Sequence, residues 1–137
     1  MKKITDSWLV FAQENLTSAL VLLDSDLYNP CLQNIQQAIE KYLKGLVLEQ
    51  GNTLKKTHSI RDLVVTLRSY DFLIDISEDE IDLIDSIYLP SKYPLASVIP
   101  DFCPDKNICL QCLDIAERIK SSVISILDKK TKSSART

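Results

Sequence analysis

The sequence predicts an all-α protein, an antiparallel up-and-down four-helix bundle with one additional short helix. Long stretches repeat apolar residues at steps of three and four, the period of a helix with one buried face. Only 2 glycines and 5 prolines interrupt 137 residues, which is little turn punctuation for a fold of many short strands. The length and the hydrophobic content of 45% suit a single domain with one core.

The first helix is expected to run to about Leu27 from a cap at Thr5 or Asp6. Apolar residues three and four apart predict its buried face: Trp8, Phe11, Ala12, Leu16, Ala19, Leu20, Leu23 and Leu27. The second helix is expected over residues 30–50, with Asn29 as its N-cap and Pro30 at its first position. A tight connection between two helices of about 30 Å makes them an antiparallel pair.

The third helix is expected to begin at Thr57, His58 or Ser59 and to end near Tyr70. Before it, Gly51 is well placed as a left-handed C-terminal cap of the second helix. The predicted core face of the third helix has four residues, Ile60, Leu63, Val64 and Leu67.

A short fourth helix is expected from the capping box of Ser77 and Glu80 to about Tyr88, laid across one end of the bundle. Three prolines then predict a long irregular connection over residues 89–103, the kind of segment that often carries function. The last helix is expected over residues 104–129. The domain is thus predicted to span residues 1–128, and residues 129–137 to form a disordered basic tail.

The charge of the chain limits what it binds. A formal net charge of −3 and a pI near 5.1 argue against broad electrostatic adhesion to nucleic acid, which needs clustered lysine and arginine. The sequence shows no apolar secretion signal and no membrane-spanning stretch, so a soluble, cytoplasmic protein is expected. Its four cysteines are then reduced packing thiols, and neither a metal nor a cofactor is predicted.

Three segments, residues 36–48, 56–60 and 88–94, match in order and spacing the motifs of one family. The first reads QQAIEKYLKGLVL, the second KTHSI and the third YLPSKYP. In these motifs the chain resembles the HEPN domain (higher eukaryotes and prokaryotes nucleotide-binding) from about Trp8 to about Leu127. The resemblance implies a helical bundle that acts as a ribonuclease, a nucleotide binder or an interaction module.

Ribonucleases of this family use an arginine followed, a turn or two later, by a histidine, and two such pairs meet across a dimer. This chain lacks the motif, because His58 is its only histidine and every arginine follows it. Lys92 also stands where smaller members of the family have an arginine, which removes a bidentate grip on phosphate. The sequence therefore argues against the usual ribonuclease mechanism, and no catalytic residue is assigned.

Four residues are candidates for contacting a nucleotide or a partner: Lys44, His58, Lys92 and Tyr93. His58 could instead cap the third helix or orient the loop before it, and Tyr93 could pack over the bundle end beside a solvated Lys92. Gln36, Gln37, Glu40 and Lys44 could equally form a polar helix face or a buried hydrogen-bond network. Lys55 and Lys56 could join Lys92 in a small positive patch.

The leading hypothesis is a non-catalytic, dimeric binding module whose partner is a nucleotidyltransferase-type protein, as in the two-gene toxin–antitoxin pairs of the family. One alternative is a nucleotide-binding protein. Another is an atypical, metal-independent ribonuclease that uses Lys92 for charge and Tyr93 or His58 for proton transfer. Whether the protein binds RNA is left open by the sequence.

Overall fold

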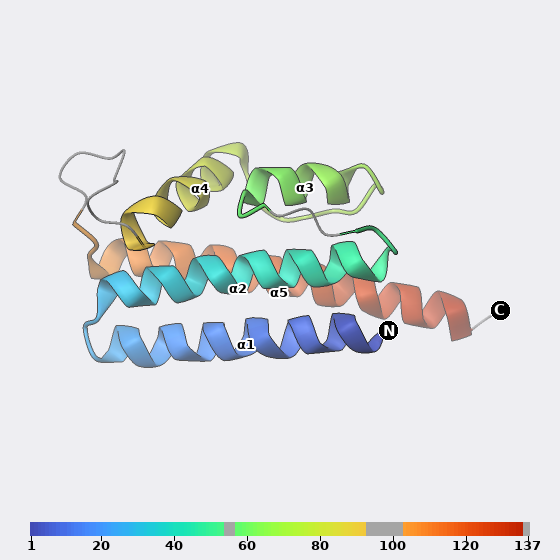
Figure 1. Ribbon diagram of the computed structural model, residues 1–137, viewed down its shortest axis with the longest axis horizontal. Helices are drawn as coiled ribbons and strands as arrows, with labels where there is room; N and C mark the ends of the chain where they lie inside the picture. The colour runs from blue at the N-terminus through green and yellow to red at the C-terminus, as the bar shows by residue number, and fades with distance from the viewer. Residues whose placement is uncertain (54–56, 93–102, 136–137) are drawn as a thin grey trace.

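The computed structural model describes residues 1–53, 57–92 and 103–135, giving the course of the backbone alone for residues 88–92 and 131–135. These ranges contain five helices and no strand: α1 (Lys3–Asp24), α2 (Tyr28–Glu49), α3 (Ile60–Arg68), α4 (Glu78–Lys92) and α5 (Lys106–Ala135). Helices α1, α2, α4 and α5 alternate in direction along the long axis (Figure 1). The predicted four-helix bundle is therefore confirmed. Its additional short helix is α3, with 9 residues, and not α4, which has 15 and forms one side of the bundle.

Helix α2 lies at the centre of the bundle. It contacts α1 on one side and α3 and α4 on the other, and α5 runs behind it (Figure 1). A helix with neighbours on three sides must be apolar around most of its circumference. Seven of its apolar side chains are completely buried: Cys31, Leu32, Ile35, Ala38, Ile39, Leu43 and Leu46.

Helix α1 is an outer helix that packs almost entirely against α2. Its buried face is centred on Ala12, Leu16 and Ala19, as predicted. The prediction was wrong at the edges of that face, because Phe11 and Leu20 are about half exposed. A helix with a single main neighbour buries a narrow stripe, and the flanking apolar residues then remain in water.

The starts of the first two helices differ from the prediction. Helix α1 begins at Lys3 without a side-chain cap, so neither Thr5 nor Asp6 caps it. The Thr5 hydroxyl is buried and donates to Glu49 Oε1 at 2.9 Å, which ties the start of α1 to the end of α2. Helix α2 begins one residue before Asn29, so Asn29 is not its N-cap. Pro30 still lies in the first turn, where a backbone N–H has no acceptor within the helix.

The other predicted caps are present. The Ser59 hydroxyl accepts from the backbone N–H of Asp62 at 3.2 Å, so Ser59 is the residue that opens α3. Ser77 and Glu80 form the predicted capping box. The backbone N–H of Glu80 donates to Ser77 Oγ at 3.2 Å, and the backbone N–H of Ser77 donates to Glu80 Oε1 at 3.0 Å. Gly51 follows α2 with φ of +83°, the left-handed conformation that glycine adopts without strain.

Two helices extend further than predicted. Helix α4 continues to Lys92, so Pro90 lies inside it. Because proline has no backbone N–H, the helix lacks one hydrogen-bond donor at that position. The rest of the predicted irregular connection, residues 93–102, lies outside the described residues. Helix α5 continues to Ala135, so the prediction of a disordered tail was wrong for residues 129–135. Lysine and alanine favour helix, no glycine or proline stops it, and Lys130 Nζ donates to Gln50 Oε1 at 3.0 Å.

Three of the four cysteines are buried packing thiols, as predicted: Cys31, Cys109 and Cys112. Burial raises the pKa of Cys109 and of Cys112 to about 12, so both thiols stay protonated at neutral pH. Cys103 is exposed. None of the described helices is long and apolar enough to cross a membrane.

Candidate functional site

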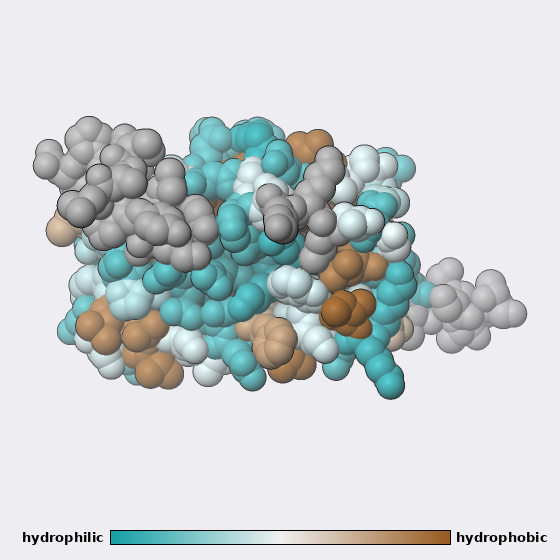
Figure 2. Space-filling view, in the orientation of Figure 1, coloured by the Kyte–Doolittle hydropathy of each residue, from teal (hydrophilic) through white to brown (hydrophobic). Residues whose placement is uncertain are grey.

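Two of the residues that the sequence singled out for binding, Lys44 and His58, meet at a polar face of α2. This face is seen between α1 and the α3–α4 pair in Figure 1, and its surface is mostly hydrophilic in Figure 2. It carries Lys41 and Lys44, both partly exposed, and beside them Glu40, which is only 6% exposed. The candidate site is therefore a polar strip on the central helix and not a deep pocket.

Glu40 contacts two of the candidate residues, His58 and Lys44. Its Oε1 lies 2.8 Å from His58 Nδ1 and 3.5 Å from Lys44 Nζ. The Glu40 and Lys44 side chains are 8% and 11% exposed, whereas that of His58 is 56% exposed. A carboxylate only accepts hydrogen bonds, so His58 Nδ1 must carry the proton in this contact. The geometry places an exposed imidazole on a nearly buried carboxylate whose charge Lys44 balances.

Two aromatic rings of α1 border the strip. Lys44 Nζ lies 6.0 Å from the centre of the Trp8 ring, and Lys41 Nζ lies 6.0 Å from the centre of the Phe11 ring. Such cation–aromatic contacts hold a lysine over a flat apolar surface. Gly45 lets the helices approach there, because a Cβ at that position would lie 3.3 Å from Trp8 Cβ. Lys41 also donates to Asn15 Oδ1 at 2.7 Å.

The start of α3, which presents His58, is held by a long-range contact that the sequence did not reveal. The Asp85 carboxylate on α4 accepts from the backbone N–H groups of Ile60 and Arg61 at 2.7 and 3.2 Å. It also accepts from the Ser59 hydroxyl at 3.3 Å. A carboxylate at a helix N-terminus satisfies donors that have no partner within the helix. Asp85 thus fixes the segment that carries His58.

The structure brings together two of the four predicted site residues. Lys44 and His58 meet through Glu40, so His58 orients its loop through this contact rather than capping α3. Lys92 is the last residue of α4, of which only the backbone is described, and Tyr93 lies outside the described residues. The patch predicted from Lys55 and Lys56 lies outside them too.

Each arginine side chain in the described part of the chain is committed to a structural contact. Arg61 pairs with Glu78 and Asp82 at 2.5 and 2.6 Å, and these hydrogen bonds raise its pKa. Arg68 donates to backbone carbonyl groups of the segment before α4. Arg118 pairs with three carboxylates on the far side of the bundle. None of the three therefore offers a guanidinium to a phosphate beside His58.

Comparison with known proteins identifies the class to which this fold belongs. The HEPN domain family matches residues 5–127, so the chain belongs to the HEPN domain family. No match to a curated protein was found.

Two solved structures are similar over nearly the whole chain. The crystal structure of TT1696 from Thermus thermophilus is 30% identical, with a TM-score of 0.76, and the match covers 90% of this chain and 98% of that one. The structure of ST0689, an archaeal HEPN homologue, is 27% identical, with a TM-score of 0.67 and the same coverage. Both comparisons support the helical arrangement described above.

Proposed function

We propose that this HEPN-domain protein is a dimeric binding module that holds a nucleotidyltransferase-type partner and does not cut RNA. The observation that carries the proposal is the exposed apolar surface of α1. Of the twelve large hydrophobic side chains exposed in the described part of the chain, five belong to this one helix: Ile4, Val10, Phe11, Leu20 and Val21. Figure 2 shows hydrophobic residues gathered along the lower edge of the molecule, over α1.

An apolar helix surface of this kind favours association. Burying apolar area contributes about 25 cal/mol per Å², and a stable interface needs on the order of 1,000 Å² or more in total. Val10 and Val21 are three helical turns apart and lie on one line of α1, and both side chains are exposed. Pairing α1 with α1 of a second copy would cover both valines in each chain.

Substituting this line of α1 should prevent self-association. The double variant Val10→Glu with Val21→Glu places charges at the centre of the proposed interface and should shift a dimer to a monomer. Light scattering coupled to size-exclusion chromatography measures the mass directly. The matched control is Val65→Glu with Leu110→Glu, which adds the same charge at exposed apolar residues of α3 and α5 and should remain dimeric. A monomeric wild type at micromolar concentration would contradict the dimer.

Family membership combined with the missing arginine and histidine pair supports the proposal of a nucleotidyltransferase-type partner. A chain without its own catalytic pair can still act by holding an enzyme. Co-expression with a nucleotidyltransferase encoded beside it, followed by purification through a tag on this chain, should yield a complex of fixed stoichiometry. Recovery of this chain alone would count against that partner.

A second candidate function, nucleotide binding, is favoured by the Glu40–His58–Lys44 cluster beside the Trp8 ring. Lys44 would supply a cation for phosphate and Trp8 a surface on which a base can stack. Glu40 opposes this role, because it already balances the charge of Lys44. Nucleotide binding is therefore the weaker of the two proposals.

A thermal-shift series with ATP tests nucleotide binding. A ligand present at 100 times its Kd should stabilise the protein by about 2.7 kcal/mol. Glu40→Gln should strengthen the shift by releasing Lys44 from its ion pair, and Lys44→Ala should abolish it. Absence of any shift in both wild type and Glu40→Gln would exclude ATP as the ligand.

A further inference from the structure

The imidazole of His58 is exposed to solvent and at the same time held in one orientation. Its side chain is 56% exposed, and its Nδ1 lies 2.8 Å from Glu40 Oε1. Because a carboxylate only accepts hydrogen bonds, the neutral ring in this contact carries its proton on Nδ1 and a lone pair on Nε2. The contact with Glu40 therefore fixes Nε2 as the nucleophilic nitrogen of the ring.

Glu40 is itself held in place. Its side chain is 8% exposed, and Lys44 Nζ lies 3.5 Å from the same Oε1 that contacts His58. Glu40 belongs to α2, the helix at the centre of the bundle. Water and salt screen a nearly buried charge less than a charge at the surface. The carboxylate therefore acts strongly on any positive charge that develops on the ring.

The neighbours of His58 in the sequence fix its backbone. The backbone N–H of Ser59 donates to Thr57 Oγ1 at 3.0 Å, and the Thr57 hydroxyl donates to Asp62 Oδ2 at 3.2 Å. The Ser59 hydroxyl donates to Asp85 on α4 at 3.3 Å. A side chain held in this way needs little rearrangement to react, which lowers the entropic part of the barrier.

Glu40 favours reactions in which the ring gains positive charge. When Nε2 forms a bond to an electrophile, the ring keeps its Nδ1 proton and so becomes a cation. A carboxylate at Nδ1 holds the ring in the reactive tautomer and stabilises that cation. The pair of His58 and Glu40 is thus arranged for attack by Nε2.

The exposure of His58 selects the electrophile. Water reaches the ring, so an acyl group on Nε2 would be hydrolysed quickly, whereas a phosphoryl group on an imidazole nitrogen persists at neutral and alkaline pH and is lost in acid. An exposed ring can also be approached by a donor as large as a second protein. A phosphoryl group is therefore the adduct that this position would keep.

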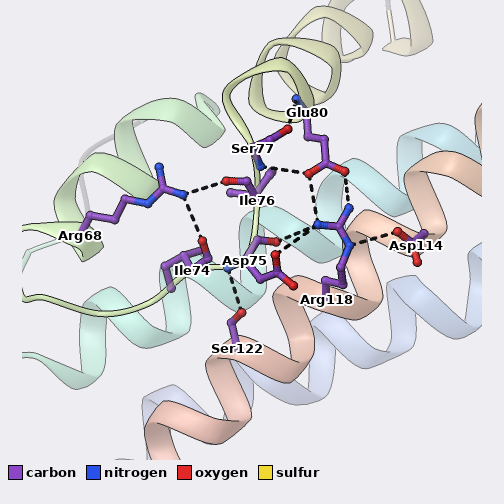
Figure 3. Close-up of polar contacts among 9 residues, drawn as sticks. All are labelled: Arg68, Ile74, Asp75, Ile76, Ser77, Glu80, Asp114, Arg118 and Ser122. Atoms are coloured by element: carbon purple, nitrogen blue, oxygen red, sulfur yellow. Dashed lines mark hydrogen bonds and ion pairs between the residues drawn. The ribbon is translucent and has the colours of Figure 1, made fainter.

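An arginine beside an attached phosphoryl group would bind it tightly. The three arginines in the described ranges have other partners. Arg61 pairs with two carboxylates of α4, and Arg68 and Arg118 hold the segment before α4 (Figure 3). A phosphoryl group on His58 would therefore remain exposed and transferable.

From this geometry we propose that His58 is a phosphoryl-acceptor site, phosphorylated on Nε2 by a phosphoramidate donor, the chemical class that includes phosphohistidine in another protein. The Nε2 lone pair attacks phosphorus as the P–N bond of the donor breaks, and the donor nitrogen leaves with the electron pair. The Nδ1 proton stays on the ring, hydrogen-bonded to Glu40. The site does not involve the outer surface of α1, so it does not depend on the proposed dimer.

The test is reaction of the whole protein with potassium phosphoramidate, followed by intact mass measurement and by phosphorus NMR, which distinguishes Nε2 from Nδ1 adducts. Folded wild type should gain one acid-labile phosphoryl group on Nε2. It should react about tenfold faster than the same chain unfolded in urea, because the hydrogen bond to the charged carboxylate stabilises the cationic ring. His58→Gln, which removes the only histidine of the chain, should gain no such group.

Glu40→Gln tests the positioning role of the carboxylate. Loss of the charge should slow phosphorylation about tenfold and give a mixture of Nε2 and Nδ1 adducts. A purely structural role of Glu40 would change the melting temperature without changing the nitrogen that reacts. The matched control is Glu14→Gln, which removes the same charge from an exposed position of α1 and should react as wild type does.

The proposal is overturned if folded wild type reacts no faster than the unfolded chain, or if the phosphoryl group is found on Nδ1. This comparison needs no variant, so it decides the matter even if Glu40→Gln does not fold. The proposal is also overturned if folded Glu40→Gln reacts like wild type, or if His58→Gln gains the same acid-labile group.

Discussion

Replacing Ile39 with alanine is expected to lower the free energy of unfolding by about 3 kcal/mol, since removing a fully buried isoleucine to alanine costs about 2–5 kcal/mol. Ile39 is 0% exposed and belongs to α2, which contacts four other helices. The cavity would open at the centre of the bundle, where its neighbours have little freedom to close it. Urea denaturation followed by circular dichroism measures the change.

The matched control for Ile39→Ala is Ile39→Val, which deletes one methylene group and should cost about 1 kcal/mol. A loss for the alanine variant no larger than that for valine would mean that α2 is not the centre of the core. Such a result would contradict the helix arrangement on which the position of the polar strip depends.

Replacing Arg118 with alanine is expected to lower the free energy of unfolding by about 2 kcal/mol. Breaking a fully buried ion pair costs about 3–5 kcal/mol, and the Arg118 and Glu80 side chains are 29% and 23% exposed, so a smaller loss is expected because of solvent screening. The variant leaves Glu80 without its bidentate partner and Asp75 without a cation.

The loss from Arg118→Ala should depend on pH. The hydrogen bond from Arg118 lowers the pKa of Glu80 against the opposing effect of burial. A carboxyl group with a lowered pKa in the folded state stabilises the fold fully above its unfolded pKa of about 4.3. That contribution is lost as the pH falls through the folded pKa. The stability difference between wild type and variant should therefore be largest at neutral pH and shrink in acid.

Arg61→Ala is the matched control for Arg118→Ala. Arg61 also pairs with two carboxylates, but Glu78 and Asp82 are 67% and 70% exposed. Water and salt screen such surface pairs, so this variant should lose clearly less stability than Arg118→Ala. Equal losses in the two variants would show that the Arg118 cluster is an ordinary surface network.

Local sequence signals predicted much of the fold. The capping box of Ser77 and Glu80 and the cap at Ser59 were predictable because each joins residues at most three apart. The buried face of α3 followed from apolar spacing in the same way. Hydrogen bonds between residues far apart in the sequence were missed. Thr5 donates to Glu49 rather than capping α1, and Asp85 on α4 caps the start of α3.

The candidate site was predictable to a similar extent. Glu40 and Lys44 are four residues apart, so their pairing on one helix face follows from helix geometry. The contact between His58 and Glu40 depends on how the loop before α3 returns to α2, which no local pattern encodes. The exposure of Phe11 and Leu20 likewise depends on which helices surround α1, and the apolar period alone carries no such information.

The claim that this chain binds and does not cut is tested most directly by incubating purified protein with total RNA. His58→Ala and Lys92→Ala are prepared in parallel, so that a contaminating nuclease can be recognised by its presence in every sample. Arg61, Arg118 and Lys44 are all held in ion pairs with carboxylates, so we expect no cleavage by this chain. RNA should stay intact with wild type, or should be degraded equally in all three samples if a contaminating nuclease is present. Cleavage by wild type that either substitution abolishes would contradict the account and establish a ribonuclease built without the arginine and histidine pair of the family.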